Sequence, residues 1–93
     1  MIIQFSARAR SDLREIYEYI ATDSVIYARQ TVRNIIRKIH LLEQHPLAGR
    51  KILKYADESR RETYFRKYRI VYCLTGSKII IVTIHHSAKL ADD

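Results

Sequence analysis

The last third of the chain, from Arg60 to Lys89, contains three short runs rich in Tyr, Val, Ile and Thr. β-Branched and aromatic residues of this kind favour the pleated, half-buried surface of a sheet. The runs cover Arg61–Arg66, Tyr68–Leu74 and Lys78–His85. Thr75-Gly76-Ser77 separates the last two and predicts a tight turn, because glycine accepts the positive φ of a hairpin corner. The sequence therefore predicts an antiparallel meander of three strands.

The residues before this meander predict a short strand and a first helix. Ile2, Ile3 and Phe5 favour a strand, and Ser6 is suited to cap a helix over about residues 7–21. Apolar side chains recur at helical spacing, so that they share one face: Ala9, Leu13, Ile16, Tyr17 and Ile20.

A second helix is predicted over about residues 25–44, with a longer apolar stripe made of Ala28, Val32, Ile35, Ile36, Ile39 and Leu42. The three polar residues between the helices, Thr22-Asp23-Ser24, are few enough to make the pair an antiparallel hairpin. Pro46 ends the second helix, since proline disfavours a helical conformation at the preceding residue.

This order of elements predicts an α+β fold in which an N-terminal strand and an antiparallel helical hairpin pack on a small antiparallel β-sheet. The 93 residues are expected to form a single domain covering 1–93. The longest apolar stretch, Ile79–Ile84, is interrupted by Thr83 and is far shorter than the roughly 18 residues of a membrane helix. The start MIIQFSARAR lacks the order of a signal peptide, and the lone Cys73 suits a reducing compartment, so we expect a cytoplasmic protein.

The net charge of +7 is distributed unevenly. Residues 1–45 hold seven Lys and Arg against five acids, whereas residues 46–93 hold ten against five. A basic stripe on a sheet favours an anionic partner, such as nucleic acid, the ribosome or an acidic protein segment. The alternative is a solvated face that only keeps the protein soluble.

Both faces of the last two strands are partly apolar. In the first of them Tyr68, Ile70, Tyr72 and Leu74 alternate with Arg69, Val71, Cys73 and Thr75. In the second, strict alternation places Ile79, Ile81, Thr83 and His85 opposite Ile80, Val82, Ile84 and His86. Because the hairpin covers only one face, a partner chain covers part of the other, or that face borders a binding groove. The alternative is that Val71 and Cys73 are simply tolerated at a partly exposed face.

The usual catalytic signatures are missing from the sequence. It has no phosphate-binding loop, no cysteine pair and no HExxH, and adjacent His85 and His86 point to opposite faces of a strand, so we expect neither a metal nor a cofactor. Arg61, Arg69 and a terminal histidine could together bind a phosphodiester and move a proton. The alternative is that Arg61 and Arg69 pair with acids such as Glu62, or with carboxylates of a partner. From the residues alone we favour binding over catalysis, because no clear acid–base pair can be assembled.

The sequence resembles the RelE/ParE superfamily of toxins from bacterial toxin–antitoxin modules, also called the plasmid stabilisation family. The resemblance covers nearly the whole chain and is carried by FSARARSDLREIYEYIA, IIRKIHLLEQHPLAGRKI, RRETYFRKYRIVYCL and IIIVTIHHSAKL. It implies the fold predicted above and a partner antitoxin whose C-terminal segment wraps the toxin, in a hetero-oligomer.

The resemblance also implies two alternative targets. RelE-like members cut mRNA on the ribosome with a strand arginine, further basic residues and often a C-terminal tyrosine. Here Arg69 matches the strand arginine and Arg61 is a looser match, while His86 could replace the tyrosine that HHSAKLADD lacks. ParE-like members instead inhibit DNA gyrase without nuclease activity, and the first helix, the HPLAGR turn and the IHHSAKL ending are more similar to them.

We therefore predict a gyrase-inhibiting toxin with no catalytic residues. The alternatives are a ribosome-dependent endoribonuclease that uses Arg61, Arg69 and His86, and a binding module that keeps the fold without toxicity. The residues predicted to contact the target or the antitoxin are Arg50, Arg61, Arg66, Arg69, Val71, Cys73, His86 and Lys89.

Overall fold

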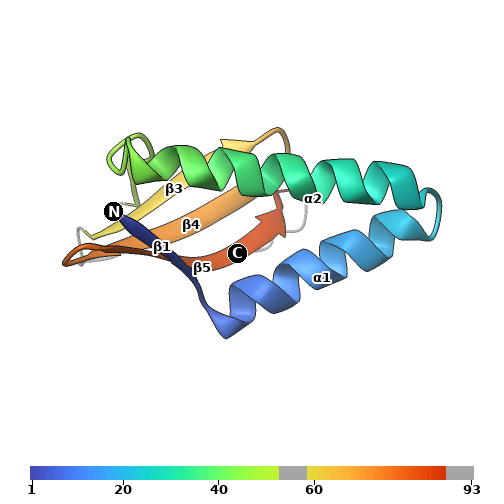
Figure 1. Cartoon of the computed structure of the whole chain (residues 1–93), viewed down its shortest axis with the longest axis horizontal. Helices are drawn as coiled ribbons and strands as arrows, with labels where there is room; N and C mark the ends of the chain where they lie inside the picture. The colour runs from blue at the N-terminus through green and yellow to red at the C-terminus, as the bar shows by residue number, and fades with distance from the viewer. Residues whose placement is uncertain (53–58, 88–93) are drawn as a thin grey trace.

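The computed structural model describes residues 1–52 and 59–87 and consists of two layers, a helical hairpin on one face of a five-stranded sheet (Figure 1). The helices are α1 (Ala7–Ala21) and α2 (Val25–His40), and a 3₁₀ turn, η1 (Leu41–Glu43), follows them. The strands are β1 (Ile2–Phe5), β2 (Arg50–Lys51), β3 (Arg60–Phe65), β4 (Tyr68–Thr75) and β5 (Lys78–His86). The predicted α+β fold is confirmed.

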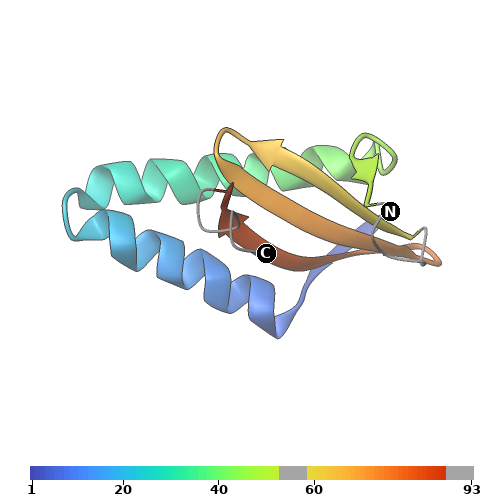
Figure 2. The ribbon, with the colours of Figure 1, turned by 180° about the vertical axis from the view of Figure 1, so that it is seen from behind.

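The sheet has the order β1-β5-β4-β3-β2. Strands β3, β4 and β5 form the predicted antiparallel meander, and β2 pairs antiparallel with β3. Strand β1 differs from the prediction of a wholly antiparallel sheet, because it pairs parallel with β5. The sheet is therefore mixed, and the first and last strands lie side by side. Figure 2 shows the face of the sheet that the two helices leave uncovered.

Both helices begin directly after a capping serine, of which Ser6 is the predicted one. Ser6 Oγ accepts a hydrogen bond from Ala9 N at 2.9 Å, and Ser24 Oγ accepts one from Tyr27 N at 3.0 Å. The second helix ends at His40, earlier than the predicted residue 44, and continues only as the tighter turn η1. Pro46 prevents any continuation of the helix beyond this turn, since proline disfavours a helical conformation at the preceding residue.

The core lies between the hairpin and the sheet. The predicted stripes are confirmed, because Ala9, Ile35 and Ile39 are fully buried and the described core consists of Ala9, Ile35, Ile39, Leu42, Ile70, Tyr72, Ile79, Ile81 and Ile84. None of the helices in the described part of the chain is both long and apolar enough to cross a bilayer.

The predicted faces of β5 are wrong beyond Ile81. Opposite β4, Tyr72 pairs with Ile81 but Val71 pairs with Thr83, so Val82 is one extra residue in β5. Such a bulge shifts every later side chain to the other face. Ile84 and His86 consequently join the helix-covered face, and Thr83 and His85 lie on the uncovered face.

The start of α1 completes the edge of β5 beyond the short strand β1. Ser6 N and Ser6 Oγ donate to the carbonyls of Ile81 and Val82 at 3.0 and 2.8 Å. Asp12 Oδ2 accepts from Ile84 N at 3.0 Å and from Thr83 Oγ1 at 2.6 Å. These bonds use backbone groups that an edge strand otherwise leaves unpaired, and they attach the hairpin to the sheet.

Tyr72 fastens the turn after η1 to the middle of the sheet. Its buried hydroxyl donates to Pro46 O and accepts from Gly49 N, both at 2.8 Å. A Cβ on Gly49 would lie 2.6 Å from both the Tyr72 hydroxyl and Glu62 O, so only glycine allows this close approach.

Replacing Tyr72 by Phe should lower the free energy of unfolding by about 1–3 kcal/mol, because a buried amide and a carbonyl each lose their partner. Urea unfolding followed by circular dichroism measures the change. Tyr27→Phe is the control, since Tyr27 is 53% exposed. Equal stability of Tyr72→Phe and the wild type would contradict the structural role of this hydroxyl.

Candidate functional site

The predicted site residues do not gather on one face of the sheet. Arg69 lies opposite Tyr64 and His85 on the face that the helices leave uncovered. Arg61 lies opposite Tyr72, and His86 lies opposite Tyr68, on the helix-covered face. The three residues of the endoribonuclease alternative are thus divided between the two sides.

Arg61 and His86 share the helix-covered face but are well separated. Tyr68 and Tyr72, the partners of His86 and Arg61, are four positions apart on β4. At about 3.3 Å per residue this is about 13 Å along the strand, and His86 and Arg61 flank β4 from opposite sides. One phosphodiester group cannot reach both.

Arg69 and Arg50 are joined by a buried acid. Glu62 on β3 is 8% exposed, and its two oxygens accept from Arg69 Nε at 2.5 Å and Arg50 Nε at 2.8 Å. Pairing of Arg69 with an acid such as Glu62 is one alternative that the sequence offers, and the structure shows this ion pair. The sequence does not indicate that Arg50 binds the same carboxylate.

The environment of Glu62 has two opposed effects on its pKa. Burial raises the pKa, and the hydrogen bonds and charges of Arg69 and Arg50 lower it. The arginines prevail, so the pKa of Glu62 lies below its ordinary value of 4.5 and the group is ionised at neutral pH. The charge of Arg69, with a 20% exposed side chain, is therefore partly compensated within the protein, because Arg50 shares the same carboxylate.

Arg61 also serves the fold. Its Nη1 donates to Gly49 O at 2.6 Å and to Leu47 O at 3.3 Å, which holds the turn that follows η1. Carbonyl acceptors leave the charge of a guanidinium uncompensated, so Arg61 still contributes to the basic character of this edge.

The predicted spare apolar surface is smaller than the sequence indicates. Val71 is only 5% exposed, although it lies on the uncovered face, and Cys73 is half-buried with Sγ 3.2 Å from Ser59 Oγ. Neither residue requires a partner chain to be removed from water. Lys89, the last predicted contact residue, lies outside the described residues.

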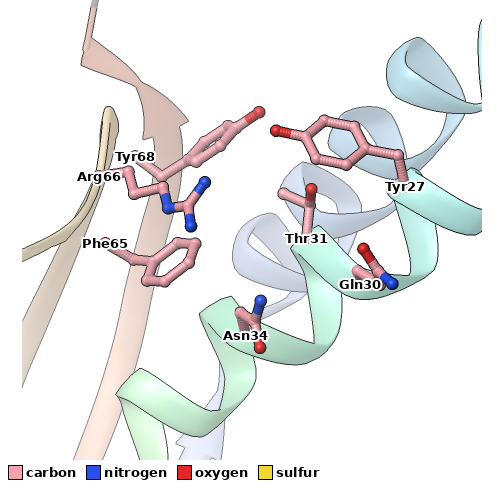
Figure 3. A pocket seen from close by; sticks show the side chains of 7 residues that line it. All are labelled: Tyr27, Gln30, Thr31, Asn34, Phe65, Arg66 and Tyr68. Atoms are coloured by element: carbon pink, nitrogen blue, oxygen red, sulfur yellow. The ribbon is translucent and has the colours of Figure 1, made fainter.

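Arg66 and His86 both lie at the end of the sheet where β4 begins. Arg66 occupies the turn between β3 and β4, with its guanidinium carbon 5.5 Å from the centre of the Phe65 ring. The His86 ring meets the edge of Tyr68, with centroids 5.3 Å apart. Here α2 and the turn enclose a cavity of about 90 Å³, lined by Tyr27, Gln30, Thr31, Asn34, Phe65, Arg66 and Tyr68 (Figure 3).

The exposed apolar surface that sequence reasoning missed is at the tip of the hairpin. Tyr19 and Ile26 are 76% and 72% exposed, and Val25 and Tyr27 are about half exposed. All four lie off the buried stripes, and large apolar residues off the stripe of a surface helix are the signal that could have revealed them.

No cluster of three or more His, Cys, Asp or Glu suited to a metal ion occurs within residues 1–52 and 59–87.

Comparison with known proteins identifies the family. The family model described as "ParE toxin of type II toxin-antitoxin system, parDE" matches residues 3–91. The chain belongs to the ParE toxin family. The predicted membership of the RelE/ParE superfamily, closer to ParE, is confirmed. Comparison with curated proteins gives no match.

Two solved structures share the fold of this ParE-family chain. A chain of the chromosomal ParDE system from P. aeruginosa superposes with a TM-score of 0.77 at 20% identity, over 92% of this chain and 95% of that chain. A chain of the toxin–antitoxin complex RelBE2 from Mycobacterium tuberculosis gives a TM-score of 0.60 at 19% identity, over 91% and 95%.

Replacing Glu62 by Gln should destabilise the protein at pH 7, because two arginines lose their counter-charge. Since the folded-state pKa of Glu62 is depressed, its ionised form contributes stability above pH 4.5 that is lost as the pH falls through the folded-state pKa. The difference in unfolding free energy between wild type and Glu62→Gln should therefore shrink as the pH falls below about 4.5.

Urea unfolding at a series of pH values from 7 to 3 tests this expectation. Glu18→Gln, an exposed change on α1, is the matched control and should leave the pH dependence unaltered. A constant difference between wild type and Glu62→Gln across the series would contradict the charge pairing.

Proposed function

We propose that the protein is the toxin of a type II toxin–antitoxin module, that it inhibits DNA gyrase, and that a cognate antitoxin neutralises it in the cytoplasm. The observation that carries the proposal is the match to the ParE toxin family over residues 3–91. Gyrase inhibition needs a binding surface rather than a set of reacting groups, and exposed cations and an exposed apolar hairpin tip provide one.

The positions of the basic residues favour this proposal over endoribonuclease activity. Arg69 is bound to Glu62, and Arg61 holds the carbonyls of the turn after η1. His86 lies on the opposite face from Arg69. Phosphodiester cleavage requires a base, an acid and cations around one reacting phosphate, and these three residues do not meet around one point.

An antitoxin partner is supported by the two structural neighbours, which are ParDE and RelBE2 toxin–antitoxin systems. The exposed side chains of Tyr19, Ile26 and Leu47 are the kind of surface that a partner chain covers. A disordered segment that orders on binding can wrap such a surface on a protein of this size.

Purified, antitoxin-free protein should produce gyrase-dependent DNA breaks and inhibit supercoiling, while mRNA on translating ribosomes stays intact. Both reactions are measured in parallel, by gel electrophoresis of plasmid DNA and by primer extension on the mRNA. Cleaved mRNA with unaffected gyrase would contradict the proposal, as would a folded sample with neither activity.

Variants identify the source of any mRNA cleavage that is observed. His86→Ala and Arg69→Ala should abolish the cleavage if these residues are catalytic, and leave it unchanged if a contaminating nuclease is responsible. His86→Ala is the cleaner variant, because Arg69→Ala also removes a partner of the buried Glu62.

Saturating antitoxin should raise the midpoint of thermal unfolding, because a ligand that binds only the folded state stabilises it in proportion to RT ln(1 + [L]/Kd). Differential scanning calorimetry of the free toxin and of the complex measures the shift. An unchanged midpoint at saturation would contradict neutralisation by a wrapping partner.

A further inference from the structure

The cavity between α2 and the β3–β4 turn is rich in hydrogen-bond donors. Arg66 contributes a guanidinium, Gln30 and Asn34 contribute side-chain amides, and Tyr27 and Tyr68 contribute hydroxyls. None of the seven lining residues is acidic. At about 90 Å³ the cavity suits a small group rather than a whole ligand, because sites for drug-sized molecules enclose roughly 300–1,000 Å³.

Arg66 differs from the other predicted contact arginines in its partners. Arg50 and Arg69 are paired with Glu62, and Arg61 is bound to backbone carbonyls. Among the residues that the structure describes, no carboxylate forms an ion pair with Arg66. Its guanidinium instead lies against the Phe65 ring, a cation–π contact that holds the group without neutralising it.

The backbone at Arg66 is strained. Its φ is +53°, and it is the one residue other than glycine with positive φ in the described chain. A residue with a Cβ is disfavoured in this left-handed region, whereas glycine adopts it readily. The two-residue turn between β3 and β4 accounts for this conformation, since tight hairpin turns need a positive φ at the first central residue. The turn directs the guanidinium toward α2 (Figure 3).

Two tyrosines approach each other from the two sides of the cavity. The hydroxyls of Tyr27 on α2 and Tyr68 on β4 point toward one another across the mouth of the cavity (Figure 3). Burial, with smaller contributions from Tyr27 and Tyr19, raises the pKa of Tyr68, so its hydroxyl keeps its proton at neutral pH and can donate. The wall beneath is formed by the ring of Phe65 and by Thr31, which is 7% exposed.

We propose that this cavity binds the carboxylate of an acidic side chain on a peptide segment of a partner protein. The planar fork of a guanidinium matches a carboxylate in a bidentate arrangement, and the neutral hydroxyls and amides can bind its remaining lone pairs. The Phe65 ring provides an apolar surface for the methylene groups of a glutamate.

The same features disfavour a nucleic-acid backbone as the occupant. Proteins that follow a phosphate chain use several cations spaced along an open groove. This cavity is small and contains one cation surrounded by neutral donors. The assignment is independent of the target, so the protein could bind a carboxylate here whether or not it acts on gyrase.

The test uses isotope-labelled full-length protein and three probes in separate NMR titrations: capped tetraglutamate, capped tetraglutamine and an octamer of thymidylate. Tetraglutamate should shift the resonances of Tyr27, Arg66 and Tyr68, whereas tetraglutamine should not. Binding of tetraglutamine with equal affinity, or of the oligonucleotide alone at these residues, would overturn the proposal.

Arg66→Gly is the decisive variant, because glycine tolerates the positive φ and the turn is preserved. It should weaken tetraglutamate binding by about tenfold or more, as expected for loss of a charge-assisted hydrogen-bonding pair. Its thermal midpoint should equal or exceed that of the wild type, which separates lost binding from lost folding.

Lys67→Ala is the matched control. It removes the same charge from the same turn but no cavity-lining group, so tetraglutamate binding should change less than about threefold, as for a screened surface charge. Equal weakening by Lys67→Ala and Arg66→Gly, or unchanged binding by Arg66→Gly, would overturn the assignment of the site to Arg66.

Discussion

The carboxylate of Glu62 is buried between guanidinium groups from β2 and β4. Removing a carboxylate from water is costly, and only the two hydrogen-bonded cations make it tolerable. Because β3 carries the acid and its two neighbours carry the bases, the group joins three strands on the face without helices. The two ion pairs of Glu62 therefore help to hold β2, β3 and β4 side by side.

The same arrangement changes the meaning of the chain's net charge of +7. A count along the sequence treats every arginine as available to an anionic partner. In the folded protein Arg69 and Arg50 share Glu62, while Arg66, in a turn, forms no ion pair with any acid of the described chain. The basic character of the surface thus resides at the edges and turns more than at the centre of the sheet.

Most of the fold could be predicted from local signals. The caps Ser6 and Ser24, the helical stripes and the Thr75–Ser77 turn each determine a nearby structure, and the structure agrees with them. The bulge at Val82 could not be predicted, because β-branched residues surround it and no glycine or proline marks it. That one extra residue reverses the faces of His85 and His86, and with them the predicted grouping of the site.

The candidate site was harder to predict because its contacts are long-range. Nothing in the sequence around Arg66 indicates that Tyr27, on a helix far earlier in the chain, faces it across a cavity. Arg69 and Glu62 are only seven residues apart in the sequence. Their contact nevertheless depends on the register of the β3–β4 hairpin, whose turn lacks glycine. Strand register and the way α2 packs on the sheet decide such contacts, and residue type alone does not reveal them.

The parallel pairing of β1 with β5 affects how the protein can fold. Ile2 is aligned with Lys78, so β1 cannot form its strand pairing until β5, the last strand in the sequence, is present. Contacts between such distant residues raise the contact order and slow folding relative to a helical protein of equal size. During synthesis the helical hairpin emerges long before the strand that α1 contacts, and its apolar stripes remain exposed until β5 is complete.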